Sequence, residues 1–255
     1  MSSDAPLTIL CFGDDLTKGC HSNGVGESPY SEEMVQLLRR MLRGRDIRVH
    51  TSGVSCDMVS MPPFERRLQM ESDQAYSSGD ARKYDWVIML AGRNDLASHH
   101  PPQNILSSLR KCWNIPLSQG SKVLALTLPE CRFRDQYVEH DWAWLNTSIL
   151  SHTQPDFYSM DLHQKIPYHS LCPRHTRMYW DHVGTATGLT EAGCEWMGGQ
   201  IARGLIAILN KTMERPASKI PPLAESDNDA VFQEERGDPE KIEEGYVVVR
   251  KQDLN

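Results

Sequence analysis

The 255-residue chain lacks the patterns that mark several large classes of protein. No apolar run approaches the roughly eighteen residues that a membrane-spanning helix needs. The first residues, MSSDAPLTILCF, have no basic segment of the kind that opens a secretion signal. Basic residues are not clustered, as they would be in a protein that binds nucleic acid. We therefore expect a soluble, cytoplasmic protein that binds neither membranes nor nucleic acid.

The seven cysteines also lack a spacing with structural meaning. They are odd in number, scattered, and form no C-x-x-C pair, which argues for reduced thiols rather than a disulfide framework or a zinc site. The histidines show no metal-ligand spacing such as H-E-x-x-H. We expect no metal and no cofactor.

The chain does have enough apolar sequence for one sizeable core. Hydrophobic residues make up 39% of it, which at this length predicts a single domain. From position 214 onward, eleven acidic residues stand against six basic ones, with several prolines and few large apolar residues. The sequence therefore predicts a domain over 1–213 and an acidic, proline-containing tail over 214–255.

Short β-rich runs alternate with helical patterns along the predicted domain. Strands are predicted at 7–12, 47–50, 86–90, 123–128 and 157–160, and helices at 30–42, 102–116, 142–151 and 190–213. This alternation predicts an α/β protein in which helices cover both faces of a five-stranded parallel sheet. Residues that directly follow the strands should converge at the carboxyl edge of that sheet.

Four sequence blocks carry the chemistry. The first, Gly13-Asp14-Asp15-Leu16, follows an apolar strand. The second is TSGVS at 51–55, the third AGRNDL at 91–96, and the fourth combines YWD at 179–181 with LTEAG at 189–193. In this order the blocks resemble those of the SGNH (GDSL-type) esterases and lipases. The segment FYSMDLHQKIPYHSL at 157–171 also resembles intracellular, fungal-type members of that family.

The resemblance implies the flavodoxin-like, three-layer fold of that family, and it reveals several departures. Asp15 occupies the position of the nucleophilic serine, and Gly188 that of the histidine base. Asp181 stands where the family has the acid that orients the base, but the interval from Asp181 to Leu189 is longer than in the family pattern. Cys56 replaces a glycine that the family often has. A serine esterase needs both its nucleophile and its base, and here both are replaced. An engineered inactive variant would normally carry one substitution, so natural divergence explains the two replacements better.

The anion-binding half of the site is retained. By resemblance, Gly53 and Asn94 are the two oxyanion donors, and Asp14 and Gly92 border the substrate. Arg93 places a guanidinium beside Asn94, where the family usually has a small residue. An ion pair between Arg93 and Asp15 would hold the aspartate ionised as a base. Arg93 turned toward substrate would instead bind a carboxylate or an enolate.

Four hypotheses for the function stay open. The one that fits the retained donors best is acid–base chemistry by Asp15, Arg93 and Asn94 on a small organic molecule. Such an isomerisation, elimination or cyclisation, for instance in a biosynthetic pathway, needs no acyl-enzyme. Alternatively, Asp15 is a nucleophile toward an epoxide or halide, with His182 as the nearest base.

The other two hypotheses give Asp15 no such role. In one, water attacks an ester directly while Gly53 and Asn94 stabilise the oxyanion, giving weak esterase activity. In the other, the chain is a non-catalytic pseudo-hydrolase that only binds a small molecule. Neither the substrate nor the oligomeric state follows from the sequence.

Overall fold

A parallel sheet forms the centre of the computed structural model, which describes residues 6–21, 26–77, 84–130, 136–181 and 188–214. Its strands are β1 (Leu7–Gly13), β4 (Ile47–Gly53), β5 (Trp86–Leu90), β6 (Lys122–Leu126) and β7 (Phe157–Met160). They pair in the order β4-β1-β5-β6-β7, and every pairing is parallel. The predicted five-stranded α/β fold is confirmed. A separate two-stranded antiparallel ribbon joins β2 (Cys20–His21) to β3 (Gly26–Glu27).

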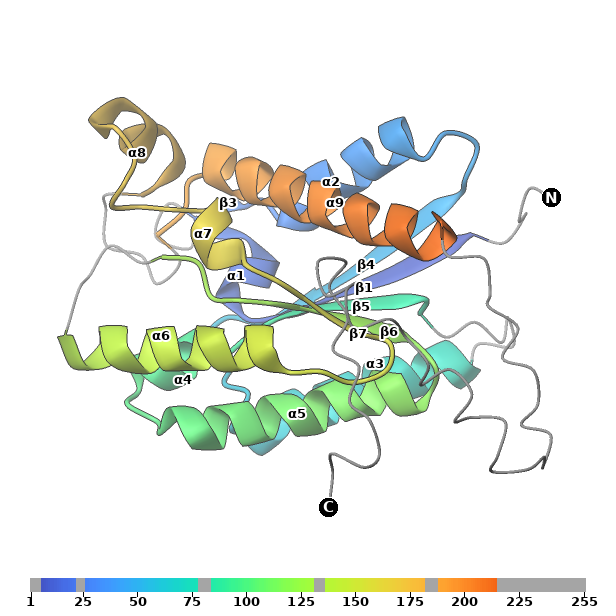
Figure 1. Cartoon of the computed structure of the whole chain (residues 1–255), viewed down its shortest axis with the longest axis horizontal. Helices are drawn as coiled ribbons and strands as arrows, with labels where there is room; N and C mark the ends of the chain where they lie inside the picture. Colours follow the sequence, from blue (N-terminus) through green and yellow to red (C-terminus); the bar gives the residue numbers. More distant parts are fainter. Residues whose placement is uncertain (1–5, 22–25, 78–83, 131–135, 182–187, 215–255) are drawn as a thin grey trace, which may run out of the picture. The chain divides into compact units, whose positions relative to one another are not determined.

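Helices cover both faces of the sheet (Figure 1). The longer ones are α2 (Tyr30–Met41), α3 (Pro62–Ser77), α5 (Pro102–Ser118), α6 (Gln136–Ser151) and α9 (Glu191–Glu214). Figure 1 shows α2 and α9 on one face and α3, α5 and α6 on the other. Short helices follow strands or connect elements: α1 (Asp15–Lys18), α4 (Arg93–Ala97), α7 (Leu162–Lys165) and α8 (Pro173–Tyr179).

Burial explains why the strands could be recognised in the sequence. The central strand β5, WVIML, is buried at every position because both of its faces carry helices. The edge strand β4 is more exposed and more polar, so the sequence predicts only its first four residues. Its pairing with β1 nevertheless continues to the end, where Gly13 lies opposite Gly53. The predicted strand 123–128 is too long, because beyond β6 the backbone of Leu128 bonds to the side chain of Asn146.

The helices show a similar mixture of agreement and difference. Four of the longer helices lie where the sequence predicts them, with ends that differ by up to six residues. The predicted elements do not include α3, whose opening Pro62 and Pro63 are residues typical of loops. Proline is nevertheless favoured in the first turn of a helix, where the missing N–H has no partner to lose. The helix then buries Phe64, Leu68 and Ser72, which lie on one face at four-residue spacing.

The strand order creates the place for a site. The chain leaves β1 and β5 toward helices on opposite sides, and sheets with this strand order generally bind ligands at the carboxyl ends of these two strands. The turns after β1, β4 and β5 carry the first three sequence blocks to this edge. Contacts group Met1–Thr212 into one unit. The predicted tail lies outside the described residues except for its first position, so the boundary at 213 stays a prediction. Among the residues described, no helix is long and apolar enough to cross a bilayer.

Candidate active site

Asp15 lies at the centre of the predicted site. It is the first residue of α1, directly after β1, and only 5% of its surface is exposed. The amide nitrogen Nδ2 of Asn94 donates to its Oδ2 at 2.8 Å. The backbone N–H of Cys56 lies 3.1 Å from both carboxylate oxygens. The turns after β1, β4 and β5 therefore meet at one carboxylate, and the structure brings Asp15 and Asn94 together.

The backbone donor at Asp15 is the N–H of Cys56. The resemblance implies Gly53, three residues earlier, as a donor to an oxyanion, and that role stays a prediction. Gly53 ends β4 beneath α1, where a side chain would overlap the backbone of Lys18. The chain then turns, and Cys56 adopts a left-handed conformation with φ of 59°. The sequence signal was present, because Cys56 occupies a position where the family often has glycine, the residue that favours this conformation.

Asn94 holds two parts of the site at once. Besides Asp15, its Nδ2 donates to the backbone oxygen of Asp57 at 3.0 Å. Gly92 caps the helix that carries Asn94, and its φ of 109° requires glycine at this turn. The next residue along, Asp95, is fully buried and accepts the backbone N–H groups of Val59 and Ser60. The α4 turn therefore fixes the segment that follows Cys56. The sequence did not predict Asp57 or Asp95 as part of the site.

Asp14 is buried beside Asp15, and its predicted place next to a substrate stays a prediction. It is the N-cap of α1, and its Oδ1 accepts the backbone N–H of Leu16 at 3.1 Å. Its Oδ2 is buried and has no hydrogen-bond partner in the described part of the chain. Burial raises the pKa of Asp14 to about 7, although the Leu16 N–H and the charge of Arg93 act in the opposite direction. The structure thus gives Asp14 a capping role and an unusually weak acidity.

Arg93 is half-buried at the first position of α4. Its charge acts on Asp14, whose pKa it lowers. The hydrogen bonds to Asp15 described above come from Cys56 and Asn94, so the ion pair expected between Arg93 and Asp15 stays a prediction. The side chain next to the site still offers a permanently charged, planar group for an anion.

The described ends of the fourth block pair with each other near the start of α9. The N–H of Asp181 donates to the backbone oxygen of Gly188 at 2.8 Å, and Trp180 forms an antiparallel bridge with Leu189. Gly188 has a φ of 68°, in the left-handed region that glycine favours. Asp181 is half-buried. His182, the nearest candidate base, lies outside the described residues, so its role stays a prediction.

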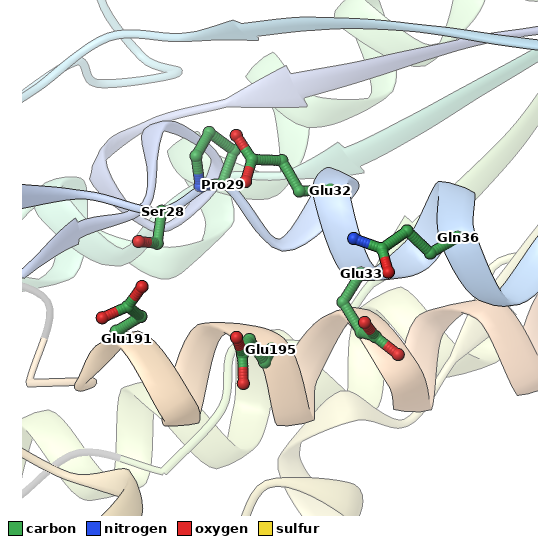
Figure 2. Close-up of a pocket in the computed structure, with 7 residues that line it drawn as sticks. All are labelled: Ser28, Pro29, Glu32, Glu33, Gln36, Glu191 and Glu195. Carbon is green, nitrogen blue, oxygen red and sulfur yellow. The ribbon is translucent and has the colours of Figure 1, made fainter.

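An acidic pocket, whose lining does not include Asp15, lies between α2 and α9 (Figure 2). Four carboxylates line it, together with Ser28, Pro29 and Gln36; they are Glu32, Glu33, Glu191 and Glu195. Three of these acids lie in the first turns of their helices, where the helix dipole favours negative charge. No group of three or more histidine, cysteine, aspartate or glutamate side chains among the described residues is arranged to hold a metal ion. The helix dipoles of α2 and α9 account for the position of three of these four acids.

Comparison with known proteins gives a match at the level of structure. No protein-family model and no curated protein matches the sequence. A member of the lipolytic G-D-S-L family from Veillonella parvula DSM 2008 has a TM-score of 0.58 at 13% identity, over 77% of this chain and 96% of its own. A psychrotrophic esterase from Pseudoalteromonas sp. has a TM-score of 0.57 at 14% identity, over 80% and 99%. A carbohydrate acetylesterase family member from Sinorhizobium meliloti has 0.54 at 16% identity, over 80% and 99%.

These matches confirm the predicted fold. The chain has the fold of the SGNH (GDSL-type) hydrolases, with a five-stranded parallel sheet between two layers of helices. At these identities the similarity concerns the fold, and any function has to be argued from the site.

Proposed function

We propose that this protein is an enzyme that acts on a small organic molecule by acid–base chemistry, with Asp15 as the base. The observation that carries the proposal is the set of contacts at Asp15. A nearly buried carboxylate accepts hydrogen bonds from the Cys56 N–H and the Asn94 amide, and these two donors fix its orientation. A carboxylate held in this way is oriented to remove a proton from a substrate.

Simple ester hydrolysis fits these contacts less well. The donors that an esterase would aim at a substrate oxyanion are the Cys56 N–H and the Asn94 amide, and both already bond to Asp15. The second bond of Asn94, to Asp57, further ties up its amide group. An oxyanion could use these donors only after Asp15 moved away. A reaction that begins with proton transfer to Asp15 needs no such movement.

The second requirement of the reaction is a group that stabilises the anion left by proton removal. Arg93 is the candidate, because it stands one residue from Asn94 and carries a charge that can bind an enolate or a carboxylate. Isomerisation, elimination and cyclisation all begin with such a proton abstraction. The proposed substrate class is therefore a small molecule with an acidic C–H bond next to a carbonyl or carboxylate group.

Deuterium exchange tests the proposal without knowledge of the product. Wild-type protein is incubated in D2O with a panel of small ketones, keto acids and hydroxy acids, and deuterium incorporation is followed by mass spectrometry. We expect incorporation with at least one substrate and its loss in Asp15→Asn, which is nearly isosteric. The matched control is Asp46→Asn, at an exposed acid that precedes β4, at the opposite end of this strand from the site. Equal exchange by wild type and Asp15→Asn would refute the proposal.

One feature of the geometry favours a second candidate, hydrolysis through an ester of Asp15. Both donors converge on Oδ2, whereas Oδ1 shares only the Cys56 N–H. If Oδ1 attacked an epoxide carbon, the C–O bond of the ring would break and its oxygen would take a proton from solvent. Oδ2 would become the ester carbonyl oxygen, already placed between two donors for attack by water.

A reactive probe separates the second candidate from the first. Incubation with 1,2-epoxy-3-(4-nitrophenoxy)propane, followed by peptide mapping, should then yield an adduct on Asp15 that Asp15→Asn lacks. Absence of this adduct rejects the ester route. If neither exchange nor an adduct is found, the non-catalytic pseudo-hydrolase becomes the better hypothesis.

A further inference from the structure

A single arginine from α3 lies against the turns that form the site. The guanidinium of Arg67 stacks on the ring of Phe12, with its central carbon 3.9 Å from the ring centroid. The ring of Phe64 lies on it as well, at 5.3 Å. The side chain is 20% exposed. The two aromatic rings hold the plane of the guanidinium in a fixed orientation.

The donors of Arg67 reach three different segments. Nη1 donates to the backbone oxygen and the hydroxyl of Ser52, at 2.7 and 2.8 Å. Nη2 donates to the backbone oxygen of Gly13 at 2.8 Å and to Oδ2 of Asp57 at 2.9 Å. Nε completes a forked contact with the same carboxylate oxygen at 3.3 Å. One cation therefore joins the ends of β1 and β4 to the turn that follows β4.

Each of these partners is next to, or two residues from, a group of the site. Gly13 precedes Asp14 and Asp15 in the sequence, and Asp57 directly follows Cys56. Arg67 thus holds both sides of the hydrogen bond between the Cys56 N–H and the Asp15 carboxylate. It does so from a helix that the sequence pattern did not predict.

The turn needs such an external restraint. The left-handed region is unfavourable for a residue other than glycine, and Cys56 has a φ of 59°. Such conformations persist where the surroundings over-determine them. Two hydrogen bonds hold Asp57: Arg67 donates to its carboxylate, and Asn94 donates to its backbone oxygen. These two bonds fix Asp57, the residue that directly follows the strained one.

We infer that Arg67 is a positioning residue, which acts through Asp57 to hold the Cys56 N–H against Asp15. Its importance for a reaction rests on the proposed function of Asp15. Its effect on the geometry of the site does not, and can be measured in the free protein.

The test uses the amide resonance of Cys56 in a ¹⁵N-labelled protein. In Arg67→Gln we expect this resonance to move upfield and its hydrogen exchange to become at least tenfold faster, because the bond to Asp15 is lost. Amides of β6, such as Leu124, should stay at their wild-type shifts. Arg66→Gln is the matched control, since Arg66 is the exposed neighbour whose Nε bonds only within its own helix, to Pro62.

Two further variants keep the inference falsifiable if Arg67→Gln does not fold. Arg67→Lys retains the charge but cannot reach Gly13, Ser52 and Asp57 together, so it should displace the Cys56 amide as well. Asp57→Asn should reproduce the effect, and the double variant should add little to it, because both changes break the same contact. A folded Arg67 variant with a wild-type Cys56 amide overturns the inference, as does full additivity with Asp57→Asn.

The outcomes also separate this inference from the proposed function. If Arg67→Gln displaces the Cys56 amide but wild type exchanges no deuterium into any substrate, positioning stands and the acid–base proposal fails. If wild type is active and Arg67→Gln changes neither the amide nor the turnover number, the inference fails and the proposed function stands.

Discussion

Oδ2 of Asp15 lies 2.8 Å from Nδ2 of Asn94, so two residues that follow different strands are in direct contact. The Cys56 N–H donates to the same carboxylate. Under the proposed function, this carboxylate is an anion at the centre of the site that belongs to the chain itself.

Removal of that anion should leave a site that binds small carboxylates. In Asp15→Ala the Cys56 N–H and the Asn94 amide lose their partner in a nearly buried position, which should lower the free energy of unfolding by about 1–3 kcal/mol. Formate fits the space and offers the missing acceptor, so added formate should restore part of this loss in urea unfolding. Chloride at the same ionic strength should not.

Wild type serves as the control for the formate experiment, because its own carboxylate already fills the donors. If formate stabilises wild type and Asp15→Ala equally, the donors are not freed by the substitution. The proposed arrangement of Asp15, Cys56 and Asn94 would then be wrong.

The acidity of Asp14 predicts a pH dependence of stability. Burial raises its pKa from 3.8 to about 7, so between these values the folded protein retains a proton that the unfolded chain releases. The free energy of unfolding should therefore fall as the pH rises from about 4 to about 7, by up to roughly 1.4 kcal/mol per pH unit from this group alone. Below this window both states carry the proton, and above it neither does.

Asp14→Asn isolates this contribution. Asparagine still accepts the Leu16 N–H as a helix cap but cannot ionise. The difference in unfolding free energy between the variant and wild type should therefore shift in favour of the variant as the pH rises through the window. Chemical denaturation at a series of pH values measures it, and a difference that stays constant across the window contradicts the raised pKa.

Much of the fold could be predicted because burial leaves a periodic trace in the sequence. The apolar run WVIML reads as a strand since each of its residues contacts the core. Asp15 and Asn94 could be placed in the site because both directly follow such strands, and parallel strands end at one edge. The edge strand β4 and the polar helix α3 leave weaker hydrophobic patterns in the sequence. The predicted β4 is therefore too short, and α3 is not predicted.

The remaining parts of the site depend on contacts between distant residues. Arg67 reaches Gly13 across 54 positions of the chain, and no local pattern specifies where a long side chain will point. The contact between the Cys56 N–H and Asp15 was not predicted for the same reason. Whether Gly53 or Cys56 faces Asp15 depends on the path of the turn, and long-range bonds to Asp57 set that path.

Thiol reactivity should divide five of the six described cysteines into two groups, with Cys20 intermediate in exposure. Cys11, Cys112 and Cys194 are buried, and burial raises the pKa of each thiol to about 12, which leaves almost no reactive thiolate at neutral pH. Cys56 and Cys172 are exposed. Iodoacetamide under native conditions should therefore modify these two first, as measured by peptide mapping over time. Rapid modification of Cys194 without unfolding would contradict the packing of α9.

The left-handed conformation of Cys56 predicts an unusual order of stabilities. In most settings glycine is less stabilising than alanine, because it has more conformational entropy to lose. At Cys56 the backbone conformation is unfavourable for any residue that has a side chain. Cys56→Gly should therefore be more stable than Cys56→Ala by about 1 kcal/mol in urea unfolding. Arg110 provides the control in the exposed face of α5, where the glycine variant should be the less stable by a similar amount. If the glycine variant is the less stable one at both positions, the turn beside Asp15 carries no strain. The hydrogen bonds of Asp57 would then not be holding a strained conformation.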